Sequence, residues 1–270
     1  MSGKLHNDIT VVVILFNTPS KKIVNLKQYK NFKLCIFDQG STYNSKKKIK
    51  ETLNFNFDYY HSTKNLGLSK GINLLIKKTK TKFCLITEPD IFIKENSIIS
   101  LKKIIKSNKN LFIVGPKYNK KKLKGNYKLT KKIDLSCVLF ETKKLLKFKF
   151  YDEDFFFFWT DVDLIKRINN SHLKMAVANK SFARHSMSSS SEKNMYINFL
   201  RDKSYKYGEF IFDYKWKNLR ILKIVRQLFQ TLIKTIFFMI IFDRKNFSKN
   251  AGYLVGIFEF IFFALRKLIS

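Results

Sequence analysis

Short apolar runs alternate with segments of helical periodicity through the first two thirds of the chain. The runs are rich in β-branched and aromatic residues and do not alternate apolar with polar positions, which is typical of strands buried on both faces. They lie at residues 9–16, 32–38, 57–61, 83–87, 111–116, 135–141 and 174–178. Because helical segments separate most of these strands, we predict an α/β fold with a mostly parallel sheet and flanking helices.

Helical periodicity also divides the chain into two parts. Helices are expected at residues 20–29, 45–53, 95–107, 161–169 and 195–207, and a further helix begins near Leu68. Residues 117–132 are basic and rich in turn-forming residues, so a surface insertion is expected there. The character of the sequence changes after Glu192, which predicts one domain at 1–191 and a C-terminal segment at 192–270.

Two strongly apolar segments, 219–242 and 251–265, dominate the C-terminal part. Lys and Arg interrupt the first, and the second is shorter than the about 20 apolar residues that a spanning helix needs. We expect helices that lie on an anionic membrane surface, at the inner face of the cytoplasmic membrane, with Lys and Arg near lipid headgroups. A helical packing domain or a homo-oligomer interface is the alternative.

The chain is strongly basic, with 53 Lys and Arg against 20 Asp and Glu and a formal net charge of +33. Such a charge suits nucleic acid, anionic lipid or a phosphorylated substrate, and it also arises when lysines cover a solvated surface. Arg, whose fork geometry serves base and phosphate recognition, is scarce, and the lysines are dispersed. We therefore expect no nucleic-acid partner and keep a basic nucleic-acid-binding protein as a competing function.

The cysteines and the N-terminus indicate a cytoplasmic protein. Cys35, Cys84 and Cys137 each lie within an apolar run and lack the spacing of a metal site, so we expect reduced core residues. The apolar run near the N-terminus is too short for a secretory signal and has no small-residue cleavage site.

Acidic residues follow one of the predicted strands at the edge of the sheet where α/β proteins bind ligands. Glu88 and Asp90 come directly after the strand 83–87 and are separated by one residue. Both carboxylates can face one hard cation, and oxygen ligands suit Mg²⁺ or Mn²⁺ bound to a nucleotide diphosphate. A simple turn at the strand end explains the same pattern without a ligand.

Two further polar segments are expected at this edge. Asp38 ends the strand 32–38 and could accept a hydrogen bond from a base or ribose, although an Asx-turn needs no ligand. The loop 65–73, NLGLSKGIN, has glycines and a lysine before a helix, so its backbone N–H groups can approach a phosphate. Its spacing matches neither a Walker motif nor a dinucleotide fingerprint, and a turn followed by a helix explains it equally well.

The most aromatic stretch, FFFFWTDVDLIKRI at 155–168, leads directly into two aspartates. We expect a helix that Thr160 caps, with Asp161 and Asp163 in a first turn where the helix dipole favours carboxylates. Capping alone explains both aspartates, but an aromatic wall beside a carboxylate is also how proteins bind a sugar face and adjust a general base. His185 follows the last predicted strand, where a lone histidine is more often structural than a ligand.

Taken in order, these segments resemble the family-2 glycosyltransferases of the GT-A fold, especially the rhamnosyltransferase-like branch. The resemblance covers about residues 9–191 and is carried by six segments. They are VVVILFN, FDQGST in place of a V-D-N-x-S-T turn, NLGLSKGIN, ITEPDIFI like an N/D-P-D metal motif, YDEDFFFFWTDVDLIKRI like an F-D-E-x-F-F-x-Y-x-E-D-V-D-L-x-x-R block, and ARHSMSSSS like a closing H-x-x-x-S.

The resemblance implies an inverting transfer of a sugar from a nucleotide donor to an acceptor hydroxyl, and it implies a role for each matched residue. The residues implied to bind the nucleotide are Phe16, Asn17, Asp38, Gln39, Asn65 and Lys70. Those implied to hold Mg²⁺ or Mn²⁺ on the diphosphate are Glu88, Asp90 and His185. Asp161 would deprotonate the acceptor, with Trp159 and Thr160 on the acceptor side of a wall formed by 155–159, and we expect Asp90 and Asp161 to share one cleft.

The resemblance further implies a dTDP- or UDP-sugar donor, with rhamnose as a candidate sugar. The acceptor would be a glycan or a lipid-linked carrier in cell-surface polysaccharide synthesis. Thr160 stands where the family usually has Glu, a change that bears on acceptor positioning, and Gln39 stands where it usually has Asn, a change that bears on donor identity. Because of these two departures, an inactive glycosyltransferase-like partner subunit is kept as an alternative.

Overall fold

The structure is a computed structural model that describes residues 6–41, 46–119, 124–186 and 194–269. The chain divides into two compact units. The first contains Met1–Tyr151 and Leu164–Glu192, and the second contains Asp152–Asp163 and Lys193–Ser270. The aromatic segment at 152–163 therefore groups with the C-terminal helices, although it lies inside the predicted domain 1–191.

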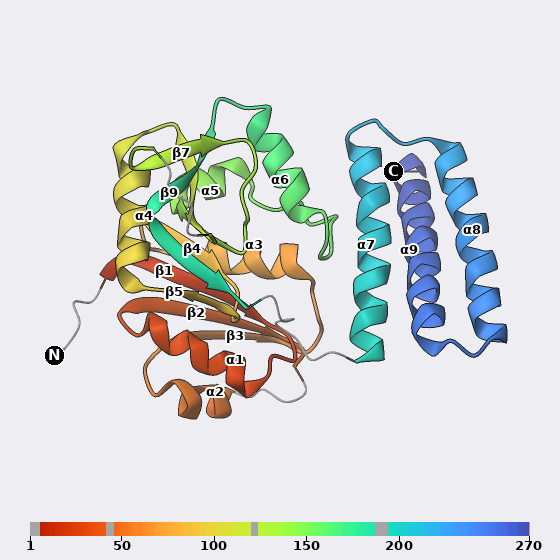
Figure 1. Ribbon diagram of the computed structural model, residues 1–270, viewed down its shortest axis with the longest axis horizontal. Coiled ribbons are helices and arrows are strands. Elements are labelled where there is room, and N and C mark those ends of the chain that lie inside the picture. The colour runs from red at the N-terminus through yellow and green to blue at the C-terminus, as the bar shows by residue number, and fades with distance from the viewer. Residues whose placement is uncertain (1–5, 42–45, 120–123, 187–193, 270) are drawn as a thin grey trace. The chain divides into compact units, whose positions relative to one another are not determined.

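The first unit is built on a sheet that is nine-stranded within the described residues. Its strands are β1 His6–Leu15, β2 Phe32–Gln39, β3 Asp58–Ser62, β4 Phe83–Thr87, β5 Ile91–Ile93, β6 Leu111–Lys117, β7 Tyr127–Thr130, β8 Cys137–Glu141 and β9 Lys174–His185. The strand order is β3-β2-β1-β4-β8-β6-β9-β5, and β7 pairs with β9 (Figure 1).

Most of these strands run in the same direction. β1 is parallel to β2 and β4, β2 is parallel to β3, and β6 is parallel to β9. β8 is antiparallel to both β4 and β6, so those two strands share one direction. The prediction of a mostly parallel sheet is therefore confirmed, and the carboxyl ends of β1, β2, β3, β4, β6 and β9 lie along one edge.

Helices cover both faces of this sheet (Figure 1). They are α1 Ser20–Ile23, the 3-10 helix η1 Val24–Tyr29, α2 Lys46–Leu53, α3 Leu68–Lys78, α4 Glu95–Ser107, α5 Thr142–Phe148 and α6 Thr160–Asn169. Successive residues of β1 point to opposite faces: Val11 and Val13 belong to the core with η1, α2 and α4, whereas Val12 belongs to the core with α3, α5 and α6. All three cysteines are buried and free, as predicted.

Several elements differ from the sequence prediction because tertiary pairing creates them. Residues 117–132 are not only an insertion, since Tyr127–Thr130 forms β7 by antiparallel pairing with β9. β9 is longer than predicted and reaches His185, where the three-residue β5 pairs with it. Such a short strand has no periodicity that a sequence could show.

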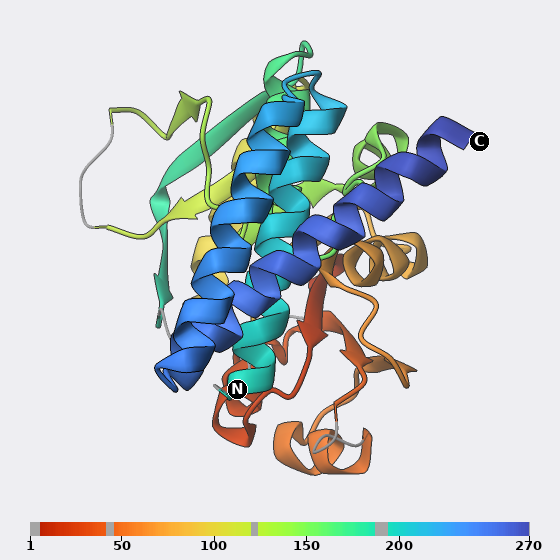
Figure 2. The same cartoon turned by 90° about the vertical axis from the view of Figure 1, so that its right-hand side faces the viewer.

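The second unit contains the long helices α7 Met195–Lys215, α8 Ile221–Ile240 and α9 Arg244–Ile269. α9 packs against both α7 and α8 and crosses them obliquely (Figure 2). The helices share a core with one residue of the aromatic segment, Phe155, which is 0% exposed between Phe210, Ile257 and Phe260. Within the described residues, no helix has a stretch long and apolar enough to cross a bilayer.

Candidate active site

The ends of β1 and β2 bring the predicted nucleotide-binding residues of the first unit together. Leu15, at the end of β1, lies opposite Asp38 in the parallel register, so Phe16 and Asn17 follow beside Asp38 and Gln39. Asn17 adopts a positive φ of 46°, and its backbone N–H donates to Ser41 Oγ at 2.9 Å. This turn leaves Phe16 and Asn17 half-buried at the sheet edge.

Two buried acceptors lie at the end of β2. Asp38 is 0% exposed and Gln39 is 4% exposed, and Asp38 Oδ1 and Gln39 Oε1 accept no hydrogen bond from the described residues. Tyr59 on β3 donates its hydroxyl to the other Asp38 oxygen at 3.2 Å. Burial raises the pKa of Asp38, while hydrogen bonds with Ser41 and Tyr59 act in the opposite direction. Buried acceptors without partners are costly, so this pair fits a ligand that presents N–H or O–H donors.

The loop before α3 packs against the end of β2 through glycines. Gly40 has a φ of 72°, and a Cβ there would lie 3.2 Å from the backbone of Asn65. A Cβ on Gly71 of α3 would lie 3.0 Å from Ile14 Cδ1 and 3.3 Å from Gln39 Oε1. Glycine at both places therefore lets the loop and the start of α3 approach the polar end of β2.

Asn65 and Lys70 have different surroundings within this loop and helix. Asn65 Oδ1 accepts a hydrogen bond from the backbone N–H of Gly67 at 2.9 Å, which forms an Asx-turn ahead of α3. Gly67 has a φ of 83° and precedes the first residue of α3. Lys70 is exposed in the first turn of that helix. The structure thus gives Asn65 a role in shaping the loop and leaves the Lys70 ammonium accessible.

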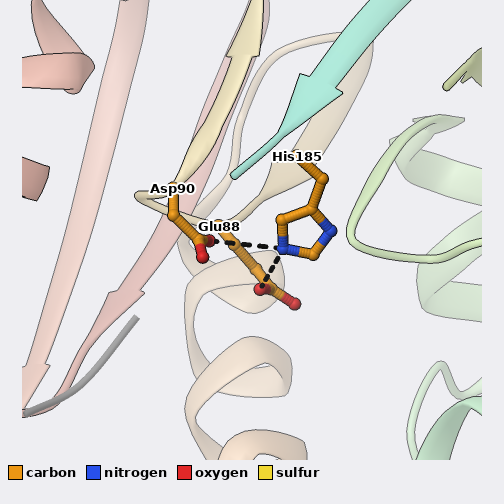
Figure 3. Close-up of side chains that lie close together, drawn as sticks. All are labelled: Glu88, Asp90 and His185. Atoms are coloured by element: carbon orange, nitrogen blue, oxygen red, sulfur yellow. Dashed lines mark ion pairs between the residues drawn. The ribbon is translucent and has the colours of Figure 1, made fainter. Parts of the chain in front are cut away.

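Glu88, Asp90 and His185 form a cluster at the same edge of the sheet (Figure 3). Asp90 follows β4 and precedes β5, whose Ile91 lies opposite His185 of β9. His185 Nε2 lies 3.6 Å from Asp90 Oδ1 and 3.8 Å from Glu88 Oε2. The antiparallel pairing of β5 with β9 therefore places His185 next to the two acids that follow β4, although the histidine is far from them in the sequence.

The donor set of this cluster fits a divalent cation. One ligand atom from each residue lies within 4.8 Å of the others, which is close to the about 4.2 Å that separates opposite ligands of a six-coordinate Mg²⁺. Asp90 is 3% exposed, and its Oδ1 accepts no hydrogen bond from the described residues. A carboxylate oxygen that is buried in this way is stabilised when a cation binds it. The two carboxylates suit Mg²⁺ or Mn²⁺, and the imidazole favours a transition metal such as Mn²⁺ over Mg²⁺.

Tyr59 and Tyr118 are two residues of this edge that sequence reasoning missed. Tyr59 donates to Asp38, and Tyr118, which directly follows β6, has a ring centroid 6.3 Å from that of His185. The Tyr118 hydroxyl is buried without a hydrogen-bond partner among the described residues. Burial, with a contribution from the charge of Glu88, raises its pKa. Its position just after a predicted strand is the only signal that the sequence offered.

Asp161, Trp159 and Thr160 lie in the second unit, at the start of α6. Asp161 is exposed in the first turn, as predicted, and Thr160 is 2% exposed. Thr160 is the first helical residue, and its hydroxyl donates to Phe157 O at 3.3 Å, so the prediction that it caps the helix is wrong by one position. Trp159 has a φ of 70° and donates its indole N–H to Tyr205 O at 3.1 Å.

The prediction that all of 155–159 forms an acceptor-side wall is corrected by the burial of Phe155. This side chain is fully enclosed by α7 and α9, so it belongs to the core and cannot touch a ligand. Phe157 is 36% exposed, and Trp159 is half-buried against Tyr205 and Phe212. The aromatic stretch therefore serves first to anchor the start of α6 within the second unit. The shared cleft of Asp90 and Asp161 stays a prediction.

Solved structures similar to this chain are nucleotide-sugar transferases. A mannosyltransferase from Pyrobaculum calidifontis in complex with GDP-Man and Mn²⁺ matches 96% of this chain and 75% of its own at 11% identity, with a TM-score of 0.58. The structure of S. aureus TarS 1-349 in complex with UDP matches 93% of this chain and 91% of the TarS chain, at 12% identity and with a TM-score of 0.53. GalNAc-T7 with UDP, GalNAc and Mn²⁺ matches 77% of this chain at 12% identity and a TM-score of 0.53. The chain spans only 48% of GalNAc-T7.

The TM-scores of these matches show a common GT-A-like fold, although the sequence identities are low. Comparison with curated protein sequences gave no match. The family model described as glycosyl transferase family 2 matches residues 11–168, which is more than half of the chain and includes the ends of β1, β2 and β4 as well as the start of α6. The chain therefore belongs to glycosyl transferase family 2.

Proposed function

We propose that this protein is a metal-dependent, inverting glycosyltransferase. It moves a hexose, with rhamnose as the first candidate, from a dTDP- or UDP-sugar to an acceptor hydroxyl. The acceptor is a glycan or a lipid-linked carrier of cell-surface polysaccharide synthesis. The observation that carries the proposal is the Asp90 carboxylate, which is buried beside Glu88 and His185 with one oxygen lacking a hydrogen-bond partner in the described chain.

The donor nucleotide is assigned to the edge formed by β1, β2 and α3. Asp38 and Gln39 offer buried acceptors to the N–H and O–H groups of a base and ribose, and Phe16 and Asn17 border them. Lys70 offers an exposed ammonium in the first turn of α3, where backbone N–H groups also favour a phosphate. These contacts bind the base, ribose and phosphate of the donor, which do not react, and so they orient the sugar.

Glu88, Asp90 and His185 are assigned to hold Mn²⁺ or Mg²⁺. When bound, the cation supplies electrostatic stabilisation for the negative charge of the departing nucleoside diphosphate. Asp161 is assigned as the general base that takes the proton of the acceptor hydroxyl while its oxygen forms the new bond to the anomeric carbon. A single displacement of this kind inverts the configuration at that carbon. Trp159 and Thr160 are assigned to the acceptor side.

The proposal is tested by titrating the full-length protein with dTDP-, UDP- and GDP-sugars by calorimetry, with Mn²⁺, with Mg²⁺ and with EDTA. One donor should bind, and EDTA should weaken its binding. Asp90→Ala should lower the affinity at least about tenfold, since a first ligand of the cation is lost. Glu51→Ala, an exposed acid of α2, is the matched control and should bind as the wild type does.

Two results would reject the proposal. One is a folded protein that binds no nucleotide-sugar under any of these conditions. The other is an Asp90→Ala variant that binds the donor with unchanged affinity and unchanged dependence on the cation. Folding of each variant is checked by circular dichroism, so that loss of binding is separated from loss of structure.

A further inference from the structure

α8 carries a row of large apolar side chains on its solvent-exposed side. The row, called here the α8 outer face, consists of Leu222, Val225, Phe229, Ile233, Ile236 and Ile240. Their spacing of three or four residues places them on one side of the helix. Each is at least 46% exposed, and Leu222 reaches 83%. A helix that faces water normally shows polar residues on this side.

The opposite side of α8 holds polar residues that face the rest of the second unit. Lys223 Nζ lies 2.6 Å from Asp213 Oδ2 and 2.7 Å from Glu209 Oε1, both of α7. Gln227 accepts a hydrogen bond from Lys206 Nζ at 3.0 Å, and Thr231 is 7% exposed. These positions recur every four residues, on the side opposite to the α8 outer face. Ile224 and Leu228 of α8 also pack against the core of the second unit, so the helix is held by polar and apolar contacts on this side while the α8 outer face stays exposed.

Cations surround the α8 outer face. Arg220 precedes the helix, Arg226 is exposed one turn after Leu222, and Arg244 and Lys245 follow the helix. The 20 residues of α8 include no Asp or Glu. An apolar strip bordered by Lys and Arg complements a lipid surface, where acyl chains accept the strip and anionic headgroups attract the cations.

We propose that the α8 outer face lies on an anionic membrane, with its apolar side chains at the boundary between headgroups and acyl chains. The anionic inner leaflet of the cytoplasmic membrane is the surface of this chemistry that a cytoplasmic protein meets. A second copy of the chain is a poorer partner for this face, because each copy has a formal net charge of +33 and borders the face with cations. The proposal is independent of the transferase activity.

The experiment is co-sedimentation of the full-length protein with vesicles of phosphatidylcholine alone and of phosphatidylcholine mixed with phosphatidylglycerol. The wild type should bind the mixed vesicles and bind phosphatidylcholine much less. Phe229→Asp should lower the affinity for mixed vesicles by about tenfold or more, since it removes one exposed aromatic side chain that the lipid would bury. Gln230→Asp adds the same charge at the next, exposed position outside the face and should change the affinity less than about threefold.

Every alternative result overturns the proposal. Equal losses in Phe229→Asp and Gln230→Asp would show that charge alone attracts the protein. Failure of the folded wild type to bind either vesicle would exclude lipid as the partner. A dimer in light scattering that Phe229→Asp dissociates would assign the face to a second copy. Circular dichroism checks both variants, and Leu222→Gln repeats the measurement near the start of α8 if Phe229→Asp does not fold.

Discussion

Asp38 is a carboxyl group with no access to water, and Tyr59 donates a hydrogen bond to one of its oxygens while the other lacks a partner in the described chain. Burial raises its pKa, so the folded protein holds this proton more tightly than the unfolded chain does. The stability gained in this way is complete below the ordinary Asp pKa of about 3.9 and is lost as the pH rises through the raised pKa.

The stability of the Asp38→Asn variant relative to the wild type should therefore increase as the pH rises. The free energy of unfolding of the variant minus that of the wild type should increase as the pH rises above the ordinary Asp pKa of about 3.9, with a slope of at most about 1.4 kcal/mol per pH unit. Urea unfolding at several pH values measures this difference. The same variant should bind the donor nucleotide more weakly, because an amide N–H₂ can replace a buried acceptor.

Tyr59→Phe is the companion variant, since it removes a hydrogen bond that lowers the pKa of Asp38. It should move the pH window of the Asp38 effect upward. A stability difference between Asp38→Asn and the wild type that shrinks as the pH rises would show that burial does not dominate at this carboxyl.

Asp161→Asn should remove the proposed general base while leaving the proposed donor site of the first unit intact. We expect kcat to fall about 10²- to 10⁴-fold, the usual contribution of a positioned base, with little change in donor affinity. Single-turnover transfer and donor calorimetry on the same preparation separate the two effects. Glu51→Gln, an exposed acid of α2, serves as the charge-matched control. Turnover near the wild-type rate would remove Asp161 from the mechanism.

Residues at strand ends were visible in the sequence because they belong to contiguous motifs. Asp38 lies at the end of β2, Asp90 follows β4 and Asp161 lies in the first turn of α6, and the period of each of these elements is readable. Tyr59 and Tyr118 were not visible, because each acts through a partner on another strand. The hydrogen bond from the Tyr59 hydroxyl to the Asp38 carboxylate joins two strands, so the spacing of residues within either strand does not predict it.

The start of α6 shows how an element can be fixed by residues far along the chain. Asp163 was expected to support the helix start through the helix dipole, but its side chain is 0% exposed and pairs with Lys215 of α7 at 2.8 Å. Trp216 donates its indole N–H to the same carboxylate at 3.1 Å. Lys215 also pairs with Asp152 at the other end of the aromatic segment. The end of α7 thus holds both ends of 152–163.

Lys215→Met should destabilise the protein by about 3–5 kcal/mol, because it leaves the buried Asp163 carboxylate without its ammonium partner. The free energy of unfolding in urea measures the loss. Lys217→Met, an exposed lysine two residues away, is the matched control and should change stability by less than about 0.5 kcal/mol.

The double variant Asp163→Asn/Lys215→Met should be more stable than Lys215→Met alone, since the uncompensated charge has gone. If the double variant is the less stable of the two, the ion pair is not what stabilises this helix start. Such a result would leave the packing of Phe155 as the anchor of the segment.

On the scale of the whole molecule, the chain separates its proposed tasks between two units. The donor and cation residues all lie in the first unit, and the α8 outer face lies in the second. Hydrogen exchange of the full-length protein with UDP and Mn²⁺ should therefore show added protection at residues 15–18, 38–41, 63–68 and 88–91. α8 should exchange as in the free protein.

Asp90→Ala serves as the control in this measurement and should lose most of the protection at all four segments. Protection confined to the second unit would place the nucleotide away from the strand ends and contradict the assigned donor site. Protection that persists in Asp90→Ala would separate nucleotide binding from the cation.

The sequence by itself determined the α/β rhythm, the strands that build the parallel part of the sheet and the family motifs at their ends, because period and turn chemistry are local properties. Only the tertiary structure decided that β5 and β7 exist and that Phe155 is core rather than ligand-facing. It also decided that Lys223 of α8 pairs with Glu209 and Asp213 of α7. Each of these features depends on contacts between residues far apart in the chain, and the local pattern of a single segment does not predict such contacts.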